Sequence, residues 1–463
     1  MFDDVAPRPA AGDRPIGVCA VSRDSDGDRA QCTFRLELTT RMTFRTLAAA
    51  CSAALFCQFA VSPTVFAADA QTHWVTAWAT ALQPIPQRSD LPPLYRAPEV
   101  AGRTVRQIVY PTLSGKTARV HLSNEYGKTA LVIDELRIAR SAGGAAALGN
   151  GNARVTFGGK SSVSVPPGAE LDSDPVVIDT AEGAPYAISA FMGPEQRIVA
   201  WHRVSNQLNY VSAPGNHTAD TSADSFRGRF TQYVWVTGLS VDAPSSAAVA
   251  AIGDSITDGM RSSLNQNRRW PDALARRFAS TGDHSTAIVN LGISGNRLLS
   301  DSPCYGESLV RRFDRDVLER PGVKTAILLI GINDINFAEM PARSGLDCDF
   351  PHTSVTAADL IAGYQRVIAD ARRRGVKVFG ATLTPASLPA PRESIRLTVN
   401  QWIRSSHAFD GVVDFDAALR DPAQPSRLQR AFDSGDHIHP SDAGYTAMAD
   451  AVPVAAVVNS TRK

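Results

Sequence analysis

The spacing of apolar residues changes near residue 245, and this change constrains the fold more than any other feature of the chain. Before it, apolar and polar residues alternate in short segments at 104–109, 118–122, 136–138 and 233–236. Turns rich in Gly, Pro, Asn and Ser separate these segments, which is the pattern of an antiparallel sandwich or jelly roll. After it, the apolar residues form short continuous runs at 249–252, 287–291, 325–330, 376–379 and 412–415. Such runs are typical of parallel strands buried on both faces.

Helical segments alternate with the later runs. The clearest begins near Thr356, where Thr356 and Asp359 form a capping box, and it ends at Gly375. Its apolar residues share one face: Leu360, Tyr364, Val367, Ile368 and Ala371. We therefore predict a flavodoxin-like, five-stranded α/β/α domain over residues 248–463. Ahead of this domain we predict an all-β sandwich or jelly-roll domain over residues 68–242 and a linker at 243–247.

The first residues are excluded from the fold. From Met42 a basic start leads into an apolar stretch from Leu47 to Val61, with small residues Val65 and Ala67 before a cleavage site. This pattern predicts a signal peptide over 42–67, a mature start at Ala68 and a secreted or periplasmic protein. Residues 1–41 are interpreted as a non-native upstream extension, with a disordered arm or an uncleaved anchor as alternatives. No other segment has the apolar length of a membrane span, so stable membrane insertion of the mature chain is not expected.

Cysteine usage agrees with export. Four of the six cysteines lie before residue 68, which leaves Cys304 and Cys348 in the mature chain. Two cysteines in an exported protein most simply form a disulfide, although two unrelated thiols are the alternative. In the chain-entropy model, closing a loop of this size stabilises the fold by about 3 to 4 kcal/mol.

The charge balance gives no sign of a polyanionic partner. The chain has 47 basic and 46 acidic residues and a net charge of +1. No global field attracts nucleic acid, and a small neutral or mixed substrate fits better.

Four short segments carry the residues of a reaction site. Ser255 follows the first predicted parallel strand, Gly295 the second and Asn333 the third, while Asp436 and His439 lie just before the last predicted helix. Ligands of an open parallel sheet bind beyond the carboxyl ends of its strands, so these five residues should converge. The helix after them is expected to begin at Pro440, with residues 441–444 as its first turn.

The residue types match acyl transfer by a serine nucleophile. Ser255 is the predicted nucleophile, His439 its base and Asp436 the carboxylate that orients His439. The backbone N–H groups of Ser255 and Gly295 and the carboxamide of Asn333 are the predicted oxyanion donors. This chemistry requires no metal and no organic cofactor.

Three other arrangements of residues compete with this set. His437 is the competing base, but it is two residues from His439 and should point the other way. Asp436, His437, His439 and Asp442 resemble a metal-ligand cluster, yet no His-Glu-x-x-His motif accompanies them. The mature chain also contains no Gly-x-Ser-x-Gly elbow of the α/β-hydrolase type.

These motifs resemble those of a known family. Gly253-Asp254-Ser255, Gly295, Asn333 and Asp436-x-x-His439 are similar to the motif blocks of the SGNH or GDSL hydrolase superfamily, with Ile256 where Leu is usual. The resemblance covers roughly residues 248–458. The opening at residues 73–80 and the preceding β-domain resemble the secreted, xylan-esterase-like branch. The resemblance implies a carboxylic ester hydrolase, with members acting on acetylated carbohydrates, aryl or short-chain acyl esters, and lipids.

Three hypotheses follow. The first is a secreted serine esterase whose substrate is a small-molecule or polysaccharide ester. The second is an acyltransferase that uses the same residues with a sugar or alcohol as acceptor. The third is a carbohydrate-binding protein with a decayed hydrolase domain, against which the complete set of site residues argues. The acyl and alcohol groups of the substrate, the role of the β-domain and the oligomeric state stay open at this stage.

Overall fold

The computed structural model describes residues 73–461. The predicted upstream extension (1–41), the signal peptide (42–67) and the mature start at Ala68 lie outside the described residues. Within residues 73–461, no helix combines the length and the apolar character needed to cross a membrane.

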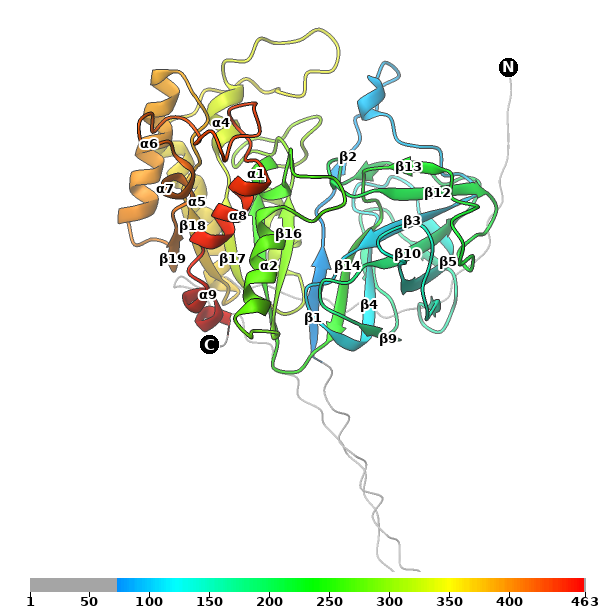
Figure 1. Cartoon of the computed structure of the whole chain (residues 1–463). Coiled ribbons are helices and arrows are strands. Elements are labelled where there is room, and N and C mark those ends of the chain that lie inside the picture. The colour runs from blue at the N-terminus through cyan, green and yellow to red at the C-terminus, as the bar shows by residue number, and fades with distance from the viewer. Residues whose placement is uncertain (1–72, 462–463) are drawn as a thin grey trace, which may run out of the picture. The chain divides into compact units, whose positions relative to one another are not determined.

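Residues 74–242 form antiparallel β-sheets, as the alternating pattern predicts (Figure 1). One sheet has the strand order β1-β14-β4-β8, with β9 also paired to β4, and the other has the order β13-β12-β3-β10-β5-β6, with β7 paired to β5. A short pair, β2 with β11, and one turn of 3-10 helix, η1 (Pro93–Tyr95), complete this part. The strands are β1 (Trp74–Ala79), β2 (Gln83–Pro84), β3 (Arg103–Val109), β4 (Gly115–Ser123), β5 (Leu131–Arg140), β6 (Ala153–Val155), β7 (Val163–Val165), β8 (Glu170–Asp172), β9 (Val176–Thr180), β10 (Tyr186–Met192), β11 (Ala200–Trp201), β12 (Asn209–Pro214), β13 (Gly228–Phe230) and β14 (Val236–Asp242). The expected all-β part is confirmed.

Residues 247–461 form a parallel sheet covered by helices. Its strands are β15 (Ala247–Gly253), β16 (Thr286–Gly292), β17 (Val323–Leu329), β18 (Lys377–Ala381) and β19 (Gly411–Val413), in the order β16-β15-β17-β18-β19. This is the predicted flavodoxin-like order, and each of the five apolar runs overlaps one strand. The helices are α1 (Ser255–Asp258), α2 (Trp270–Ser280), α3 (Leu309–Phe313), the π-helical turn η2 (Asp314–Leu318), α4 (Ile332–Phe337), α5 (Ala357–Arg373), α6 (Ala390–Ser405), α7 (Phe415–Leu419), α8 (Asp442–Ala451) and α9 (Val454–Thr461).

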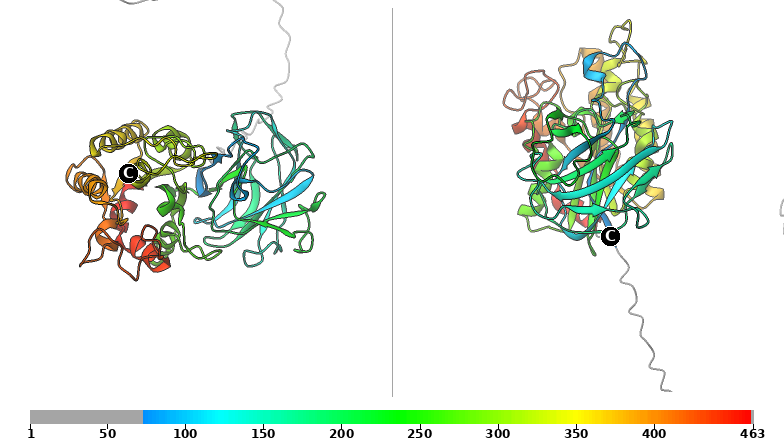
Figure 2. Two further views of the ribbon diagram at one scale, coloured as in Figure 1. Left: turned by 90° about the horizontal axis from the view of Figure 1, so that it is seen from above. Right: turned by 90° about the vertical axis from the view of Figure 1, so that its right-hand side faces the viewer.

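The helices lie on both faces of this sheet, which confirms the three-layer arrangement (Figure 2). Helix α2 packs against α8 and β16, whereas α5 packs against α3, α6 and β18. The capping box of α5 is present: the Thr356 hydroxyl accepts the Asp359 N–H at 3.2 Å, and the Asp359 carboxylate accepts the Thr356 N–H at 2.8 Å. Helix α5 ends at Arg373, just before Gly375.

Two local predictions were wrong. The strand expected at 233–236 begins only at Val236, because Trp235 has a φ of 35°, in the left-handed region that interrupts a strand. Tyr233 instead forms an isolated bridge with His202. The helix after His439 begins at Asp442, capped by Ser441, and it is not the last, since α9 follows Pro453.

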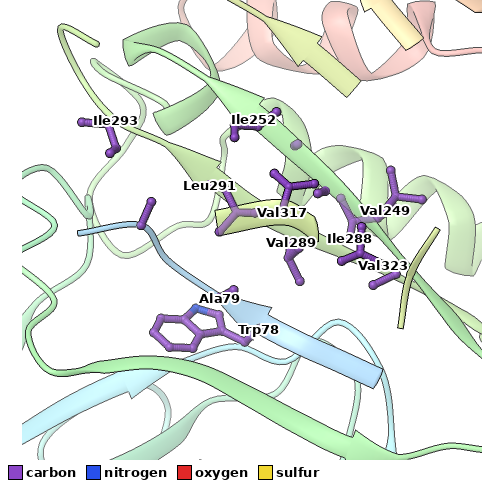
Figure 3. Close-up of a cluster of buried hydrophobic side chains, with 14 of the residues drawn as sticks. Trp78, Ala79, Val249, Ile252, Ile288, Val289, Leu291, Ile293, Val317 and Val323 are labelled. Carbon is purple, nitrogen blue, oxygen red and sulfur yellow. The ribbon is translucent and has the colours of Figure 1, made fainter. Parts of the chain in front are cut away.

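The β-part and the α/β-part share one hydrophobic core. Trp78 and Ala79 of β1 lie beside the residues of β16 that include Val289 and Leu291 (Figure 3). The contact also covers the free edge of β16, where the Thr112 hydroxyl lies 3.0 Å from the Ile288 N–H and 2.9 Å from the Ile288 carbonyl. At Ile288, the backbone groups of this edge strand therefore have a hydrogen-bonding partner in the β-part.

Candidate active site

Ser255 lies where strand β15 turns into helix α1. Asp254 is the N-cap residue, and its Oδ1 accepts the Ile256 N–H at 3.0 Å, so Ser255 is the first residue of the helix. The turn requires glycine at position 253, because a Cβ there would lie 2.0 Å from the Leu329 carbonyl oxygen. Ser255 is therefore fixed at the carboxyl end of the central strands, where the sequence predicts it.

His439 and Asp436 form a hydrogen-bonded chain with Ser255. The His439 Nε2 lies 2.8 Å from the Ser255 Oγ, and the His439 Nδ1 lies 2.8 Å from the Asp436 Oδ2. An ionised carboxylate only accepts hydrogen bonds, so the proton on Nδ1 donates to Asp436. The Nε2 is then free to accept the proton of the Ser255 hydroxyl.

The environment of Asp436 favours its ionised form. Burial works against the charge, but the His439 N–H at 2.8 Å and the Ile438 N–H at 3.1 Å donate to Oδ1. Together with the His439 ring, these donors hold the pKa of the Asp436 carboxyl below its usual range. Arg261 adds an Nε contact to Oδ2 at 3.1 Å from the exposed side.

His437 lies away from this chain. Its Nδ1 contacts the Asp433 Oδ2 at 2.6 Å, and its side chain is 70% exposed. The φ of His437 is 68°, in the left-handed region of the backbone. The competing base considered from the sequence therefore makes no contact with Ser255.

Two of the three predicted oxyanion donors, Gly295 and Asn333, follow the two strands that flank β15. Gly253 pairs with Gly292 of β16 and with Leu329 of β17, so the segments after these three strands leave the same edge. Gly295 has a φ of 83°, and within the described residues its N–H has no hydrogen-bond partner. The Asn333 Nδ2 donates to the Asn296 carbonyl at 3.0 Å, which uses one of its two N–H bonds. Both groups thus retain an N–H for a ligand.

Arg312 stabilises this edge of the sheet, and its role was not predicted from the sequence. The guanidinium is fully buried and donates to the Gly253 carbonyl at 2.9 Å, the Leu291 carbonyl at 3.0 Å and the Asn296 Oδ1 at 3.0 Å. Its charge is paired with Asp316 at 2.9 Å. In the sequence, Arg312 and Asp316 have the spacing of an ordinary surface pair on a helix, so no signal distinguished them.

Two other carboxyls near the site are buried. Burial raises the pKa of Asp254 to about 7. Burial also raises the pKa of Asp334 to about 6, although this side chain accepts the N–H groups of Leu298 and Leu299 at 2.8 and 2.9 Å. Asp334 therefore fixes the segment that follows Gly295 and Asn296.

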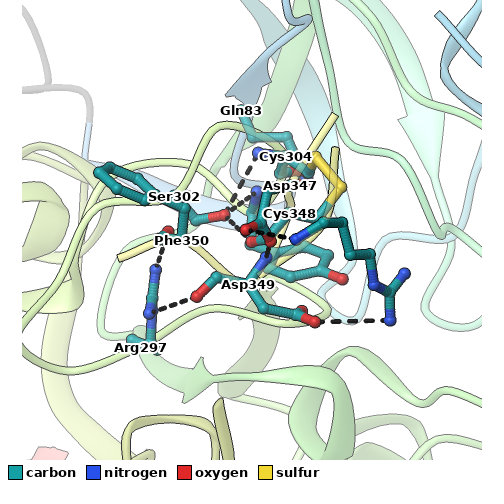
Figure 4. Close-up of a disulfide and its surroundings, with 10 residues drawn as sticks. Gln83, Arg297, Ser302, Cys304, Asp347, Cys348, Asp349 and Phe350 are labelled. Atoms are coloured by element: carbon teal, nitrogen blue, oxygen red, sulfur yellow. Dashed lines mark hydrogen bonds and ion pairs between the residues drawn. A yellow bond between two sulfur atoms is a disulfide. The ribbon is translucent and has the colours of Figure 1, made fainter. Parts of the chain in front are cut away.

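The predicted disulfide is present. Cys304 and Cys348 are joined, with their Cα atoms 5.0 Å apart (Figure 4). The bond connects the loop at 293–308, which contains Gly295, with the loop at 338–356. Next to Cys304, the Tyr305 ring covers Gly295, where a Cβ would lie 2.4 Å from the ring.

The residues of the alternative metal cluster have other partners. His437 pairs with Asp433, and the Asp442 Oδ1 accepts the Ser263 N–H at 2.9 Å. Among residues 73–461, no group of three or more His, Cys, Asp or Glu side chains is arranged to hold a metal ion.

Comparison with known families identifies the α/β-part. Residues 251–447 match the model of the GDSL-like Lipase/Acylhydrolase family. This part of the chain is a GDSL-like lipase/acylhydrolase domain, which makes the protein a carboxylic ester hydrolase by class. The superfamily resemblance found in the motifs is confirmed.

Solved structures are similar over this domain. A lipolytic-type protein of the G-D-S-L family from Desulfitobacterium hafniense is 24% identical, with 46% of this chain and 99% of that chain covered and a TM-score of 0.33. A GDSL-like lipase from Bacteroides thetaiotaomicron is 17% identical, with coverage of 46% and 88% and a TM-score of 0.32. An acetyl xylan esterase from Geobacillus stearothermophilus is 22% identical, with coverage of 47% and 96% and a TM-score of 0.34. Such likenesses carry no activity or substrate to this chain. No curated protein matches it.

Proposed function

We propose that this chain is a secreted serine esterase that hydrolyses its substrate through an acyl-enzyme on Ser255. The observation that carries the proposal is the continuous chain from Asp436 through His439 to Ser255, with both contacts at 2.8 Å. These are the distances at which a base takes the proton of a nucleophile.

In the first half-reaction, the Ser255 Oγ attacks the carbonyl carbon of the ester while its proton moves to the His439 Nε2. The resulting tetrahedral intermediate collapses, the bond to the alcohol oxygen breaks, and His439 gives the proton to the leaving alcohol. Asp436 keeps the imidazole in the correct tautomer and stabilises its protonated form. The acyl group stays on Ser255.

In the second half-reaction, water replaces the alcohol. His439 takes a proton from the water, whose oxygen attacks the acyl carbon, and the proton returns to the Ser255 Oγ as the carboxylic acid leaves. In both halves, the negative oxygen is assigned to the N–H groups of Ser255 and Gly295 and to the Asn333 Nδ2. Loss of one such donor typically reduces kcat by about 10²- to 10³-fold.

For the substrate, we propose acetylated carbohydrate or short-chain or aryl esters. The similarity of residues 73–80 and of the β-part to the xylan-esterase-like branch supports this choice. Export is proposed on the signal-like segment at 42–67 and agrees with the Cys304–Cys348 disulfide.

The test is a series of p-nitrophenyl esters from acetate to palmitate, run beside acetylated xylan, with Ser255→Ala as the matched control. We expect the highest kcat/KM for the short acyl chains, release of acetate from xylan, and no activity in Ser255→Ala. Repeating the assay with a sugar acceptor separates hydrolysis from acyl transfer, because a transferase forms a new ester in place of free acid. Undiminished activity in Ser255→Ala would refute the proposed mechanism.

A further inference from the structure

A buried contact between two side chains links the β-part to the helix that carries Ser255. The His202 Nε2 lies 2.9 Å from the Asp258 Oδ1, and both side chains are almost completely buried. His202 directly follows strand β11, and its backbone is fixed by mutual hydrogen bonds with Tyr233 at 2.8 and 3.1 Å. Its Nδ1 lies 3.1 Å from the Ala81 carbonyl. The ring is therefore held at both nitrogens by oxygen atoms and has little freedom to rotate.

Asp258 also contacts the segment that contains Gly295. The Asp258 Oδ2 accepts the Ser294 N–H at 2.9 Å and the Ser294 hydroxyl at 2.5 Å. We call residues 293–297 the oxyanion loop. Because Ser294 immediately precedes Gly295, two hydrogen bonds at Ser294 determine the direction in which the Gly295 N–H points.

The same carboxylate belongs to α1, the helix that begins with Ser255. Asp258 thus connects the nucleophile to the oxyanion loop, and its backbone packs closely against the end of β16. At Gly292, the end of β16, a Cβ would lie 2.3 Å from the Asp258 N. Without His202, the buried Asp258 Oδ1 would lose its partner, and a carboxylate that turned toward another donor would weaken its two hydrogen bonds with Ser294.

We propose that His202 is a positioning residue for the oxyanion loop, acting through Asp258 and Ser294. The β-part therefore supplies a residue on which the acyl-transfer geometry depends. This inference rests on the proposed function, in which the Gly295 N–H binds the oxyanion. Neighbouring contacts support the same role, since the Asn206 Nδ2 donates to the Gly259 carbonyl at 2.5 Å and the Asn206 carbonyl accepts the Asn265 N–H at 2.9 Å.

The main variant is His202→Leu, which removes both ring nitrogens at similar volume. We expect kcat to fall about 10- to 100-fold with KM within about threefold of the wild type, because a displaced donor weakens the transition state more than the bound substrate. The inhibition constant of an alkyl trifluoromethyl ketone, which forms an oxyanion on Ser255, should rise by a similar factor. The pH dependence of kcat/KM should keep its midpoint, since His439 and Asp436 are untouched.

Two conservative variants and one control complete the design. His202→Gln can place an amide donor near the position of Nε2 and should recover most of the lost kcat. Ser294→Ala removes the hydroxyl bond to Asp258 but keeps the backbone N–H bond, so it weakens the same path from its other end, and its effect should be less than additive with His202→Leu. The control is His121→Leu, in which the replaced ring pairs with Asp172 at 2.8 Å and Glu170 at 3.4 Å inside the β-part. It should leave kcat unchanged.

The outcomes separate this inference from the proposed function. If Ser255→Ala is inactive while a folded His202→Leu keeps kcat and the ketone inhibition constant within about twofold of the wild type, the positioning role is wrong and the serine mechanism stands. If His202→Leu does not fold, Ser294→Ala decides, and an unchanged kcat there overturns the inference. If Ser255→Ala remains active, both fall.

Discussion

At the scale of single residues, two carboxyls close to Ser255 are held in different states by their surroundings. Asp436 receives hydrogen bonds from the N–H groups of Ile438 and His439 and from the His439 ring, and its pKa is lowered. Asp254 has one donor, the Ile256 N–H, in a fully buried position that raises its pKa to about 7. The first environment suits a group that must stay ionised beside a histidine, whereas the second suits a structural N-cap.

Replacing the members of the Asp436–His439–Ser255 chain should remove activity in unequal steps. We expect Ser255→Ala and His439→Ala each to lower kcat by about 10⁴- to 10⁶-fold, because they remove the nucleophile and its base. Asp436→Ala should cost about 10- to 100-fold less, since His439 keeps its position next to Ser255. Steady-state kinetics on p-nitrophenyl acetate measure all three, with circular dichroism to verify the fold.

His437→Ala is the matched control for this series, because its ring lies two residues away and contacts Asp433 instead of Ser255. Its kcat should stay within about twofold of the wild type. A large loss in His437→Ala together with an active His439→Ala would reverse the assignment of the base.

The raised pKa of Asp254 predicts a dependence of stability on pH. Below its ordinary value of 3.8 the carboxyl is protonated in both states, so it contributes nothing to the pH dependence. Between 3.8 and about 7 the folded state keeps a proton that the unfolded state has lost, so the free energy of unfolding falls as pH rises. Each pKa unit corresponds to about 1.4 kcal/mol, which makes the whole effect on the order of a few kcal/mol.

The variant Asp254→Asn should lack this decline. Urea unfolding at pH 4, 5, 6 and 7 measures it as the difference between wild type and variant, because Asp334, whose pKa is raised to about 6, titrates in both proteins. A pH dependence that is identical in the two proteins would show that Asp254 is not responsible.

Much of the candidate site could be predicted from the sequence because its members are close in sequence to strand ends. Ser255, Gly295 and Asn333 follow three successive apolar runs, and parallel strands bring their carboxyl ends to one edge. Arg312, Asp258 and His202 could not be found in this way. Apart from the Arg312–Asp316 pair, their contacts join residues far apart in the sequence, such as His202 and Asp258, which are 56 positions apart, and only the packed tertiary structure brings them together.

At the scale of elements, the loops at 293–308 and 338–356 form one connected unit. Arg297, two residues after Gly295, donates from Nη2 to the Phe350 carbonyl at 2.6 Å and from Nη1 to the Pro351 carbonyl at 2.8 Å. The Ser302 hydroxyl donates to the Cys348 carbonyl at 2.6 Å, and the Gln83 amide donates to the Cys304 carbonyl (Figure 4). The disulfide ties the two loops together beside Gly295.

Removing the disulfide should therefore weaken activity before it unfolds the sheet. In Cys304→Ala/Cys348→Ala we expect a lower kcat and a lower Tm, with the far-UV spectrum retained at moderate temperature. The bond closes a sequence separation of 44 residues, which corresponds to about 4 kcal/mol in the chain-entropy model. A thiol reductant should act on the wild type in the same direction and leave the double variant unaffected. A reduced wild type with unchanged kcat and Tm would contradict this prediction.

The secondary structure was predictable where one physical signal dominated. The buried run of β15 and the capping box of α5 are such cases, since hydrophobic pattern and local hydrogen bonds agree there. The strand at 233–236 failed because the left-handed backbone at Trp235 interrupts it, and the residues around Trp235 make long-range contacts. Within them, the Gln107 Oε1 accepts the Val234 N–H at 2.6 Å, a contact over 127 residues that no local pattern contains.

At the scale of the whole described chain, the β-part completes the α/β-part. One hydrophobic core runs from β1 into β15 and β16, and the edge of β16 is covered instead of exposed. Further contacts cross at the Arg315 guanidinium, which lies 2.8 Å from Glu307 and also binds Glu125 of the β-part. A separate contact, between His202 of the β-part and Asp258 of α1, connects the β-part to the oxyanion loop.

The cover over β16 can be tested with one hydroxyl. Thr112→Val keeps the volume but removes the oxygen that accepts the Ile288 N–H at 3.0 Å and lies 2.9 Å from the Ile288 carbonyl. Leaving these backbone groups unsatisfied should lower the free energy of unfolding by about 1 to 3 kcal/mol. Thr117→Val is the control, because the Thr117 hydroxyl has no hydrogen bond within residues 73–461. Urea unfolding of both variants measures the difference, and equal stabilities would mean that the edge of β16 does not depend on the β-part for its hydrogen bonds.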